Sequence, residues 1–297
     1  MSLYWQDRYQ PRREPDRIIR LMTLEDVPGA LTLSQSVGWE HQARDLERLL
    51  YWSPDGCFVM VEDGGLVIGT VSSVSYETEL AWIGQMIIAP DRQRQGLGGQ
   101  LMRAVLDHLI TRGTQRIMLD ASEAGRPLYR SLGFRELYQV ERWQGRASTY
   151  LGPRARQMRP ADLADILALD TALSGLNRAH ILTRLIEEFP NLAWVDYQQG
   201  KLEGYLLGRM VQNGAYLGPW MSRSAAPAER LLRVALEQLQ GQAITLNIPD
   251  SNGRSVVLAS NHNLRRIRHC TRMIYGDAQP VFHEPLTELS IASLATG

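Results

Sequence analysis

A glycine-rich segment in the first half of the chain lies between an apolar stretch and a helical pattern. Residues 80–90 (LAWIGQMIIAP) predict a buried strand that ends at Pro90, and residues 96–113 carry leucines at helical spacing. The connecting loop reads Gln93, Arg94, Gln95, Gly96, Leu97, Gly98 and Gly99. Glycines let backbone N–H groups approach a ligand, and the start of a helix adds unpaired donors and a partial positive charge. The segment therefore predicts a site for a phosphate or pyrophosphate group.

Two common phosphate-binding motifs do not fit this loop. A P-loop needs Gly-Lys-Ser/Thr and no lysine is near, while a dinucleotide fingerprint starting at Gly96 needs a glycine where Leu101 stands. The spacing of Gln93, Gly96 and Gly98 after a strand instead resembles the acetyl-CoA loop of the GNAT acetyltransferase superfamily. The resemblance implies that acetyl-CoA is bound, and coenzyme A released, by the loop 93–99 together with the strand residues Met86, Ile87 and Ile88.

A second motif supports the same resemblance. Residues 128–134 read LYRSLGF, so that Tyr129 is followed four residues later by Gly133 and Phe134. GNAT domains commonly carry this pattern on the helix after their fifth strand, and the resemblance covers roughly residues 17–145. It implies that Tyr129 lies near the coenzyme sulfur and protonates the departing thiolate, which is a general-acid role. A tyrosine that only packs in the core is the alternative.

The resemblance also implies direct attack of an amine on the thioester, which requires a base. Many family members place a glutamate on the fourth strand, whereas residues 82–86 here read WIGQM. The nearest carboxylates are Glu77 and Glu79, which we expect to act directly or through a water chain; a solvated hairpin tip is the alternative. The six histidines show no metal-ligand spacing, so we expect a structural role for each of them and no metal site.

Apolar periodicity predicts a mixed α/β architecture for the first half, with a central sheet flanked by helices. Strands are expected at residues 17–22, in a hairpin over 57–74, at 80–90, at 116–121 and from 134 onward. Helices are expected at 24–37, 41–52, 96–113 and 123–134. Thr23 is a candidate N-cap for the first helix, and the second helix would begin at His41.

The second half repeats the first. MTLEDVPGAL (22–31) aligns with MRPADLADIL (158–167), AWIG (81–84) with AYLG (215–218), and QLMRAVLDHL (100–109) with RLLRVALEQL (230–239). Several matches in the same order predict two tandem copies of one GNAT-like domain. The expected divisions are a polar arm at 1–16, a catalytic domain at 17–146, a linker at 147–154 and a degenerate copy at 155–297.

The second copy lacks the residues that carry the chemistry. Residues 219–229, which replace 85–99, are four fewer and contain no glycine, and Val257 aligns with Tyr129. We therefore expect no coenzyme in this copy and a role in shaping the acceptor cleft. Four residues are candidates for a wall that accepts a cation there, or alternatively for ordinary core and surface positions: Trp194, Asp196, Tyr216 and Trp220.

Composition sets the remaining expectations. The 297 residues are 44% hydrophobic and 22% charged with no formal net charge, which argues against nucleic acid or a membrane as the main partner. The two cysteines, Cys57 and Cys270, suit buried positions in a reducing cytoplasm. The sequence predicts an acetyl-CoA-dependent N-acetyltransferase acting on a small primary amine. An acyl-CoA-responsive regulatory module and a protein-amine acetyltransferase are the alternatives, and a monomer and a homodimer both stay open.

Overall fold

The computed structural model describes residues 17–39, 41–149, 151–279 and 286–297. The arm expected at 1–16 lies outside the described residues. The first half contains β1 Ile18–Leu21, α1 Val27–Ser36, α2 Ala43–Trp52, β2 Cys57–Glu62, β3 Leu66–Tyr76, β4 Leu80–Ile88, α3 Leu97–Thr111, β5 Ile117–Ala121, α4 Arg126–Ser131 and β6 Phe134–Arg146. The second contains β7 Arg156–Gln157, α5 Leu163–Ser174, α6 Ala179–Glu188, β8 Ala193–Gln198, β9 Lys201–Val211, β10 Gly214–Ser222, α7 Ala225–Gln238, β11 Ala243–Pro249, α8 Gly253–Asn261, β12 Arg265–Tyr275 and β13 Glu288–Ser290.

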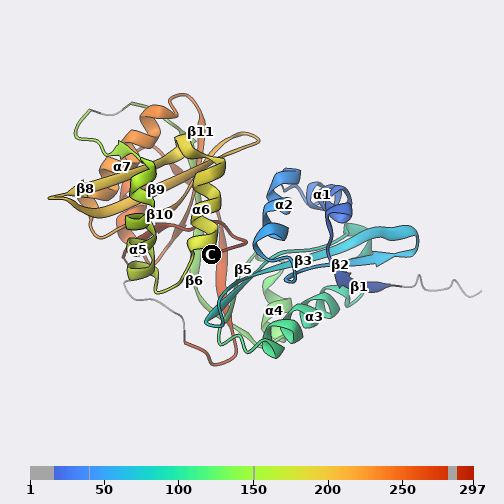
Figure 1. The fold of residues 1–297 in the computed structure, drawn as a ribbon. Helices are drawn as coiled ribbons and strands as arrows, with labels where there is room; N and C mark the ends of the chain where they lie inside the picture. Colours follow the sequence, from blue (N-terminus) through green and yellow to red (C-terminus); the bar gives the residue numbers. More distant parts are fainter. Residues whose placement is uncertain (1–16, 40, 150, 280–285) are drawn as a thin grey trace, which may run out of the picture.

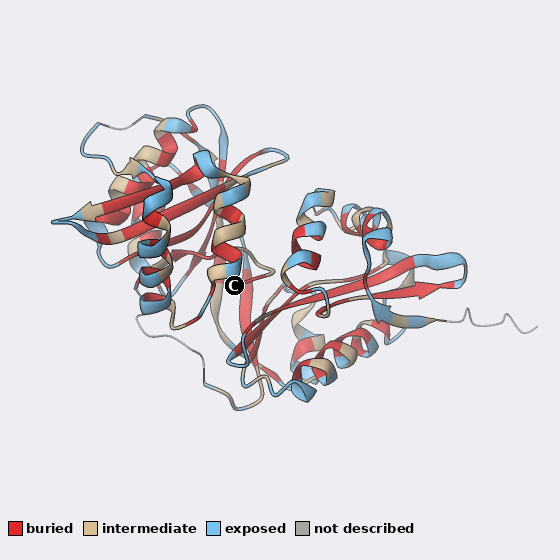
Figure 2. Ribbon diagram, viewed as in Figure 1, coloured by how far each residue is buried: buried red, intermediate tan, exposed pale blue. Residues whose placement is uncertain are grey.

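The strands form one sheet that runs through both halves (Figure 1). Its order is β1-β2-β3-β4-β5-β12-β6-β11-β10-β9-β8-β7, and β13 pairs with β10. In the first half α1 and α2 cover one face of the sheet and α3 and α4 the other (Figure 1). Side chains are buried along the strands and on the sheet-facing sides of the helices (Figure 2). The mixed α/β class and the flanked sheet predicted from the sequence are confirmed.

Each half gives its last strand to the other half. Strand β12 pairs with β5 of the first half, and β6 pairs with β11 of the second, while β6 and β12 pair with each other at the centre. A buried ion pair joins the exchange, because Arg272 on β12 donates to both carboxylate oxygens of Asp120 on β5, at 3.0 and 3.1 Å. The exchange means that residues of the second half line the cleft of the first.

The internal repeat is confirmed element by element, since both halves run strand, two helices, three strands, helix, strand, helix, strand. The entry to each half is also the same in atomic detail. Arg20 donates to the two oxygens of Asp26 at 2.7 and 2.8 Å, and Arg156 does the same to Asp162 at 2.7 and 2.8 Å. Both aspartates then accept a backbone N–H three residues earlier, which fixes the start of the following helix.

Helix boundaries differ from the prediction: a 3-10 turn at Leu24–Asp26 precedes α1, and α4 covers Arg126–Ser131 where the sequence predicts 123–134. The helix expected from His41 begins at Ala43, so His41 lies in the connection between α1 and α2. Gln42 takes the N-cap position and donates its backbone N–H to Asp45 at 2.9 Å, so the helix begins two residues after His41. The histidine is thereby placed at the edge of the sheet rather than on a helix face. In the described part of the chain no helix is long and apolar enough to cross a membrane.

Candidate active site

Strands β4 and β5 begin as neighbours and then separate. Their parallel pairing joins Ala81 to Ile117 and ends at Ile83 and Leu119, although β4 continues to Ile88. On its other side β4 carries a bulge, because Thr70 of β3 lies opposite Ile87 while Ser72 lies opposite Gly84. The gap that opens beside β4 is the first cleft.

Gln85 lies in this bulge in an unusual backbone conformation. Its φ angle of 52° is in the left-handed region, which non-glycine residues rarely adopt. The hydroxyl of Thr70 donates to the Gln85 carbonyl at 2.8 Å and stabilises the bulge from the neighbouring strand. Strain that the surrounding structure maintains in this way often marks a functional site.

The predicted phosphate loop follows β4 and leads directly into α3. Gly96 is the N-cap residue of α3 with a φ of 78°, a conformation that glycine adopts at no steric cost. The Gln93 side chain donates to the Ile88 carbonyl at 3.1 Å and holds the loop against the end of the strand. Residues 93–96 are exposed. Within the described residues no acceptor contacts the backbone N–H groups of residues 97–99.

This loop fits an anionic group such as the pyrophosphate of coenzyme A. Three unpaired N–H groups point along the first turn of a helix whose dipole adds partial positive charge. A Cβ added to Gly98 would lie 3.1 Å from Met86 Cε and 3.3 Å from Leu128 Cδ2, so the glycine keeps the backbone close to the cleft wall. The structure brings the loop and the strand residues 86–88 to the same end of the first cleft.

Tyr129 lies on α4 at the sheet face that α3 also covers. Its ring packs edge-on against Phe134 at 6.0 Å, and only 8% of the residue is exposed. No hydrogen bond joins the hydroxyl to a described residue, and Cys270 on the exchanged strand β12 lies close enough to affect the pKa of Tyr129. Burial raises the pKa of the Tyr129 hydroxyl, so the group is protonated at neutral pH and able to donate.

Glu77 and Glu79 lie at the turn between β3 and β4, at the other end of β4 from the phosphate loop. Both are exposed, and Glu77 accepts a hydrogen bond from Asn177 of the second half at 2.9 Å. Six residues of extended strand separate Glu79 from Gln85, about 20 Å at ~3.3 Å per residue. The structure therefore does not bring these carboxylates to the bulge at Gln85, and their role as a base stays a prediction.

The corresponding gap in the second half is filled by the chain itself. Strands β10 and β11 pair at Ala215–Ile244 and Tyr216–Thr245 and then separate, as β4 and β5 do. Strand β13 enters this second cleft and pairs with β10. Ser290 bridges the two walls: its hydroxyl donates to the Leu217 carbonyl at 2.8 Å and accepts the Asn247 N–H at 3.3 Å. This supports the expectation that the second copy binds no coenzyme.

Beyond β13 the chain crosses to the first half. Tyr216 and Arg209 donate to the carbonyls of Ile291 and Ala292 at 2.7 and 2.8 Å. Trp82 of β4 then donates to the Leu294 carbonyl at 3.3 Å, and Tyr76 donates to that of Thr296. This crossing segment, residues 291–297, connects the second cleft to the wall of the first.

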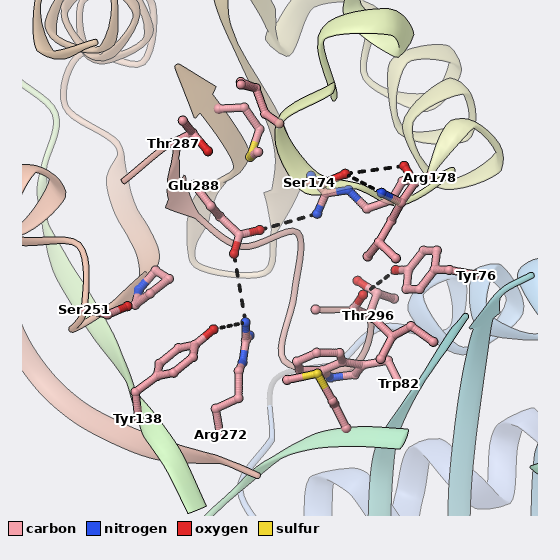
Figure 3. Close-up of a pocket in the computed structure, with 17 residues that line it drawn as sticks. Tyr76, Trp82, Tyr138, Ser174, Arg178, Ser251, Arg272, Thr287, Glu288 and Thr296 are labelled. Carbon is pink, nitrogen blue, oxygen red and sulfur yellow. Dashed lines mark hydrogen bonds and ion pairs between the residues drawn. The ribbon is translucent and has the colours of Figure 1, made fainter. Parts of the chain in front are cut away.

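A cavity of about 170 Å³ lies at the opening of the second cleft, between the two halves (Figure 3). Aromatic side chains form much of its wall, and its charged groups are paired with one another. Arg178 pairs with Asp170 at 2.6 Å. Arg178 also lies 3.4 Å from one Glu288 oxygen, and Arg272 lies 3.9 Å from the other (Figure 3). The residues that the cavity shares with the crossing segment are Thr296 and Gly297.

The four residues expected to line an acceptor wall have different surroundings. Trp194 and Trp220 are fully buried in the core of the second half, and Asp196 pairs with Arg230 at 2.7 Å, so these three have structural roles. Tyr216 alone faces a cation, the guanidinium of Arg209, whose carbon lies 3.9 Å from the ring centre. Arg209 therefore already occupies the predicted cation-accepting face.

Sequence reasoning missed a polar cluster beside the bulge, which is formed by His41, Gln85, Arg142 and Arg209. His41 Nε2 lies 3.4 Å from Gln85 Nε2. Burial lowers the pKa of His41, and the charges of Arg209 and Arg142 lower it further. The sequence predicts His41 at the start of a helix, and only the structure places it between α1 and α2. No sequence signal pointed to Arg142, since its place depends on the strand exchange.

Comparisons with known proteins agree with this fold. The Acetyltransferase (GNAT) family model matches residues 24–134, and the Acetyltransferase (GNAT) domain model matches residues 166–285. Holothin acyltransferase of Pseudoalteromonas sp. (strain SANK 73390) is 25% identical over 242 residues, which cover 80% of this chain and 81% of that protein.

Two solved structures show the same fold along most of the chain. A Pyrococcus horikoshii protein, provisionally named an acetyltransferase, superposes with a TM-score of 0.79 at 23% identity and covers 100% of this chain and 98% of its own. A tandem GNAT protein from the clavulanic acid biosynthesis pathway superposes with a TM-score of 0.63 at 14% identity, covering 89% of this chain and 100% of its own. Because the two family models together match more than half of the residues, this chain belongs to the GNAT acetyltransferase family as a tandem member.

Proposed function

We propose that the protein is an acetyl-CoA-dependent N-acetyltransferase for a small primary amine, with one active site in the first cleft. The observation that carries this proposal is the open gap beside β4, which has unpaired N–H donors at one end and a protonated, unbonded tyrosine hydroxyl beside it. Membership of the GNAT family and the similarity to an acyltransferase support the reaction type.

The chain's own residues would divide the work as follows. The N–H groups of residues 97–99 bind the pyrophosphate, and the free edge of β4 at 86–88 accepts the extended arm of the coenzyme. When bound, acetyl-CoA supplies an acetyl thioester as the electrophile. Tyr129 gives its proton to the leaving thiolate, which makes the thiolate a better leaving group inside a dry cleft. Glu77 and Glu79 stay candidates for a base only through intervening water.

The test is release of free thiol from acetyl-CoA in the presence of a panel of primary amines. Tyr129→Phe should lower turnover about 100-fold, the low end for general-acid catalysis, with coenzyme A affinity unchanged. Tyr275→Phe is the matched control, because Tyr275 packs on the other side of the same Phe134 ring at 5.3 Å. Equal turnover of Tyr129→Phe and the wild type would remove Tyr129 from the mechanism. Coenzyme binding without acetylation of any amine would favour a regulatory module.

A further inference from the structure

Two arginines near the crossing segment have no carboxylate partner among the described residues. Arg142 on β6 donates through Nε to the side-chain oxygen of Asn247 at 3.1 Å. Arg209 on β9 donates to the Ala292 carbonyl at 2.8 Å and stacks on Tyr216. Both side chains are half-buried, and burial lowers the pKa of both guanidinium groups. Arg268 adds a third positive charge near Arg142.

The internal repeat shows how unusual this arrangement is. Two exchanged strands place an arginine at equivalent positions. Arg272 on β12 lies opposite Asp120 on β5, and Arg142 on β6 lies opposite Asn247 on β11. Asp120 neutralises Arg272, whereas the amide of Asn247 leaves the charge of Arg142 in place. A half-buried positive charge is costly unless it is paired, so an anionic ligand would stabilise this position.

The crossing segment connects these arginines to the bulge, because Arg209 donates to the Ala292 carbonyl and Ala295 packs against Gly84, the residue before Gln85. His41 lies on the other side of Gln85, within reach of the charge of both arginines. His41 Nδ1 is 2.7 Å from the buried hydroxyl of Ser34, which fixes the ring. The pKa of His41 is lowered first by burial and then by the charges of Arg209 and Arg142, while Asp45 opposes the shift. The imidazole is therefore unprotonated at neutral pH and able to accept a proton.

Gln85 offers an unpaired polar atom at the same place. One end of its side-chain amide faces His41 Nε2, and Oε1 is buried without a hydrogen-bond partner among the described residues. Turning the amide over would only exchange which end is unpaired. Buried polar atoms are rarely left without a partner, so this one indicates a ligand group that the bulge is built to receive.

We propose that His41, Gln85, Arg142 and Arg209 form the acceptor site, and that the acceptor is a primary amine that also carries a carboxylate. The two guanidinium groups bind the carboxylate, and Gln85 and His41 hold the amino group beside the bulge. This inference rests on the proposed acetyl transfer and names its substrate class.

The step balances within the site. His41 Nε2 accepts one proton from the acceptor ammonium and later passes it to water. The freed amine nitrogen forms a bond to the thioester carbonyl carbon, and the carbon–sulfur bond breaks. The second amine proton leaves as the amide forms, while Tyr129 protonates the sulfur and is reprotonated in turn. The products are an N-acetyl amino carboxylate and coenzyme A.

The test compares pairs of acceptors that differ only in the anionic group. β-Alanine is set against propylamine, and L-phenylalanine against phenethylamine. We expect kcat/KM to favour the carboxylate member of a pair at least ~100-fold in the wild type. Arg142→Gln and Arg209→Gln should lower kcat/KM for that member at least ~10-fold and change the neutral amine less than ~3-fold, and Arg209→Lys should restore part of the loss. Arg112→Gln, at an exposed arginine on the end of α3, is the control.

His41 is tested by the pH profile. In the wild type kcat/KM should fall only at a pH below the ordinary imidazole value of 6.5, because burial first and then the nearby arginine charges lower the pKa of His41, and protonation removes the base. His41→Gln should lower kcat and lose this acid limb. His108→Gln is the matched control. His108 lies on α3 and packs against Phe58, and burial lowers the pKa of its imidazole too. An unchanged acid limb in His41→Gln would overturn the role of His41.

A binding measurement separates this inference from the proposed function. Titration calorimetry with N-acetyl-β-alanine and coenzyme A reports on the site without turnover. Preference for neutral amines, or equal losses for both members of a pair in the arginine variants, overturns the carboxylate site and leaves acetyl transfer standing. Better use of O-phosphoethanolamine than of β-alanine overturns the carboxylate and leaves an anion site. If N-acetyl-β-alanine binds and the binding depends on Arg209, but no amine is acetylated, the carboxylate site is supported and acetyl transfer is overturned. If neither binding nor acetylation is observed, the site and the transfer are both overturned.

Discussion

The first and second clefts start from the same geometry and differ in what completes them. In both, two parallel strands pair for two or three residues and then separate. The edge of β4 beyond Ile83 faces a gap that leads to free N–H donors and to Tyr129. The edge of β10 beyond Tyr216 is paired with β13, and Val257 stands exposed where the tyrosine would be.

The difference shows how the same pair of separating strands can be completed in two ways. Backbone groups at a separated pair of strands need partners, which a bound cofactor can supply in one copy. In the second cleft the chain supplies partners with its own strand β13, and Ser290 connects both walls. The charges follow the same rule, because arginines at the second cleft are paired with carboxylates whereas Arg142 and Arg209 near the crossing segment are not.

The largest effect is expected where β13 leaves the second cleft. A Cβ at Gly218 would lie 2.2 Å from the Ile291 carbonyl oxygen, and Ile291 is fully buried. Gly218→Ala should therefore lower the free energy of unfolding by about 2–3 kcal/mol, as overpacking does. Gly84→Ala at the matching position of β4 meets the half-buried Ala295 at 2.6 Å and should cost less. Urea unfolding measures both.

Gly253→Ala serves as the control for the glycine pair, because a Cβ at this first residue of α8 meets no atom within 4 Å. It should leave the unfolding free energy unchanged or raise it slightly. Equal losses of unfolding free energy for Gly84→Ala and Gly218→Ala would contradict this prediction. They would mean that the chain next to β13 is held no more firmly than the later part of the crossing segment.

The next effect concerns coenzyme binding. Gly98→Glu places a carboxylate at the start of α3 and should weaken coenzyme A at least ~10-fold, or about 1.4 kcal/mol. Ser224→Glu places the same charge at the exposed N-cap of α7 and should leave the affinity unchanged. Titration calorimetry should give one coenzyme A per chain for the wild type. Two molecules per chain, or an effect of Ser224→Glu, would break the distinction between the clefts.

Much of the fold was readable from the sequence because it is local. Leucines at helical spacing in α3 and α7 and apolar runs in β4 and β10 predicted the elements, and their repetition predicted two copies. The strand exchange was not predictable, since β6 and β12 are equally suited to pair within either half. The assignment depends on long-range contacts such as Arg272 with Asp120, which no local pattern encodes.

The site was predictable only in part for the same reason. The phosphate loop and Tyr129 are contiguous motifs, so spacing alone indicated them. Gln85 and His41 are 44 positions apart and meet only because a bulge turns one strand residue toward a loop between helices. Arg142 and Arg209 lie on β6 and β9, and the placement of β6 follows from the exchange.

The smallest effect tests a feature that the two halves share. Asp26 and Asp162 lie at the entries to the first and second halves, and each is held by two hydrogen bonds from one arginine. The hydrogen bonds from Arg20 lower the pKa of Asp26. Those from Arg156 lower the pKa of Asp162 to about 2. A lowered pKa means that the folded state favours the charged form. Its stabilisation is therefore complete above the ordinary pKa near 3.8 and is lost as pH falls toward 2.

Asp26→Asn and Asp162→Asn should each lower the free energy of unfolding by about 1 kcal/mol at pH 7, because the arginine partners are partly exposed and solvent screens the pairs. Glu123→Gln at an exposed position is the control and should change little. The two variants and the wild type should converge as pH approaches 2, when the wild-type carboxyls are themselves protonated. Similar losses in both halves would show that the scaffold stayed equivalent while the clefts diverged. A loss confined to Asp26 would instead mean that the second half had given up its entry motif along with its ligand.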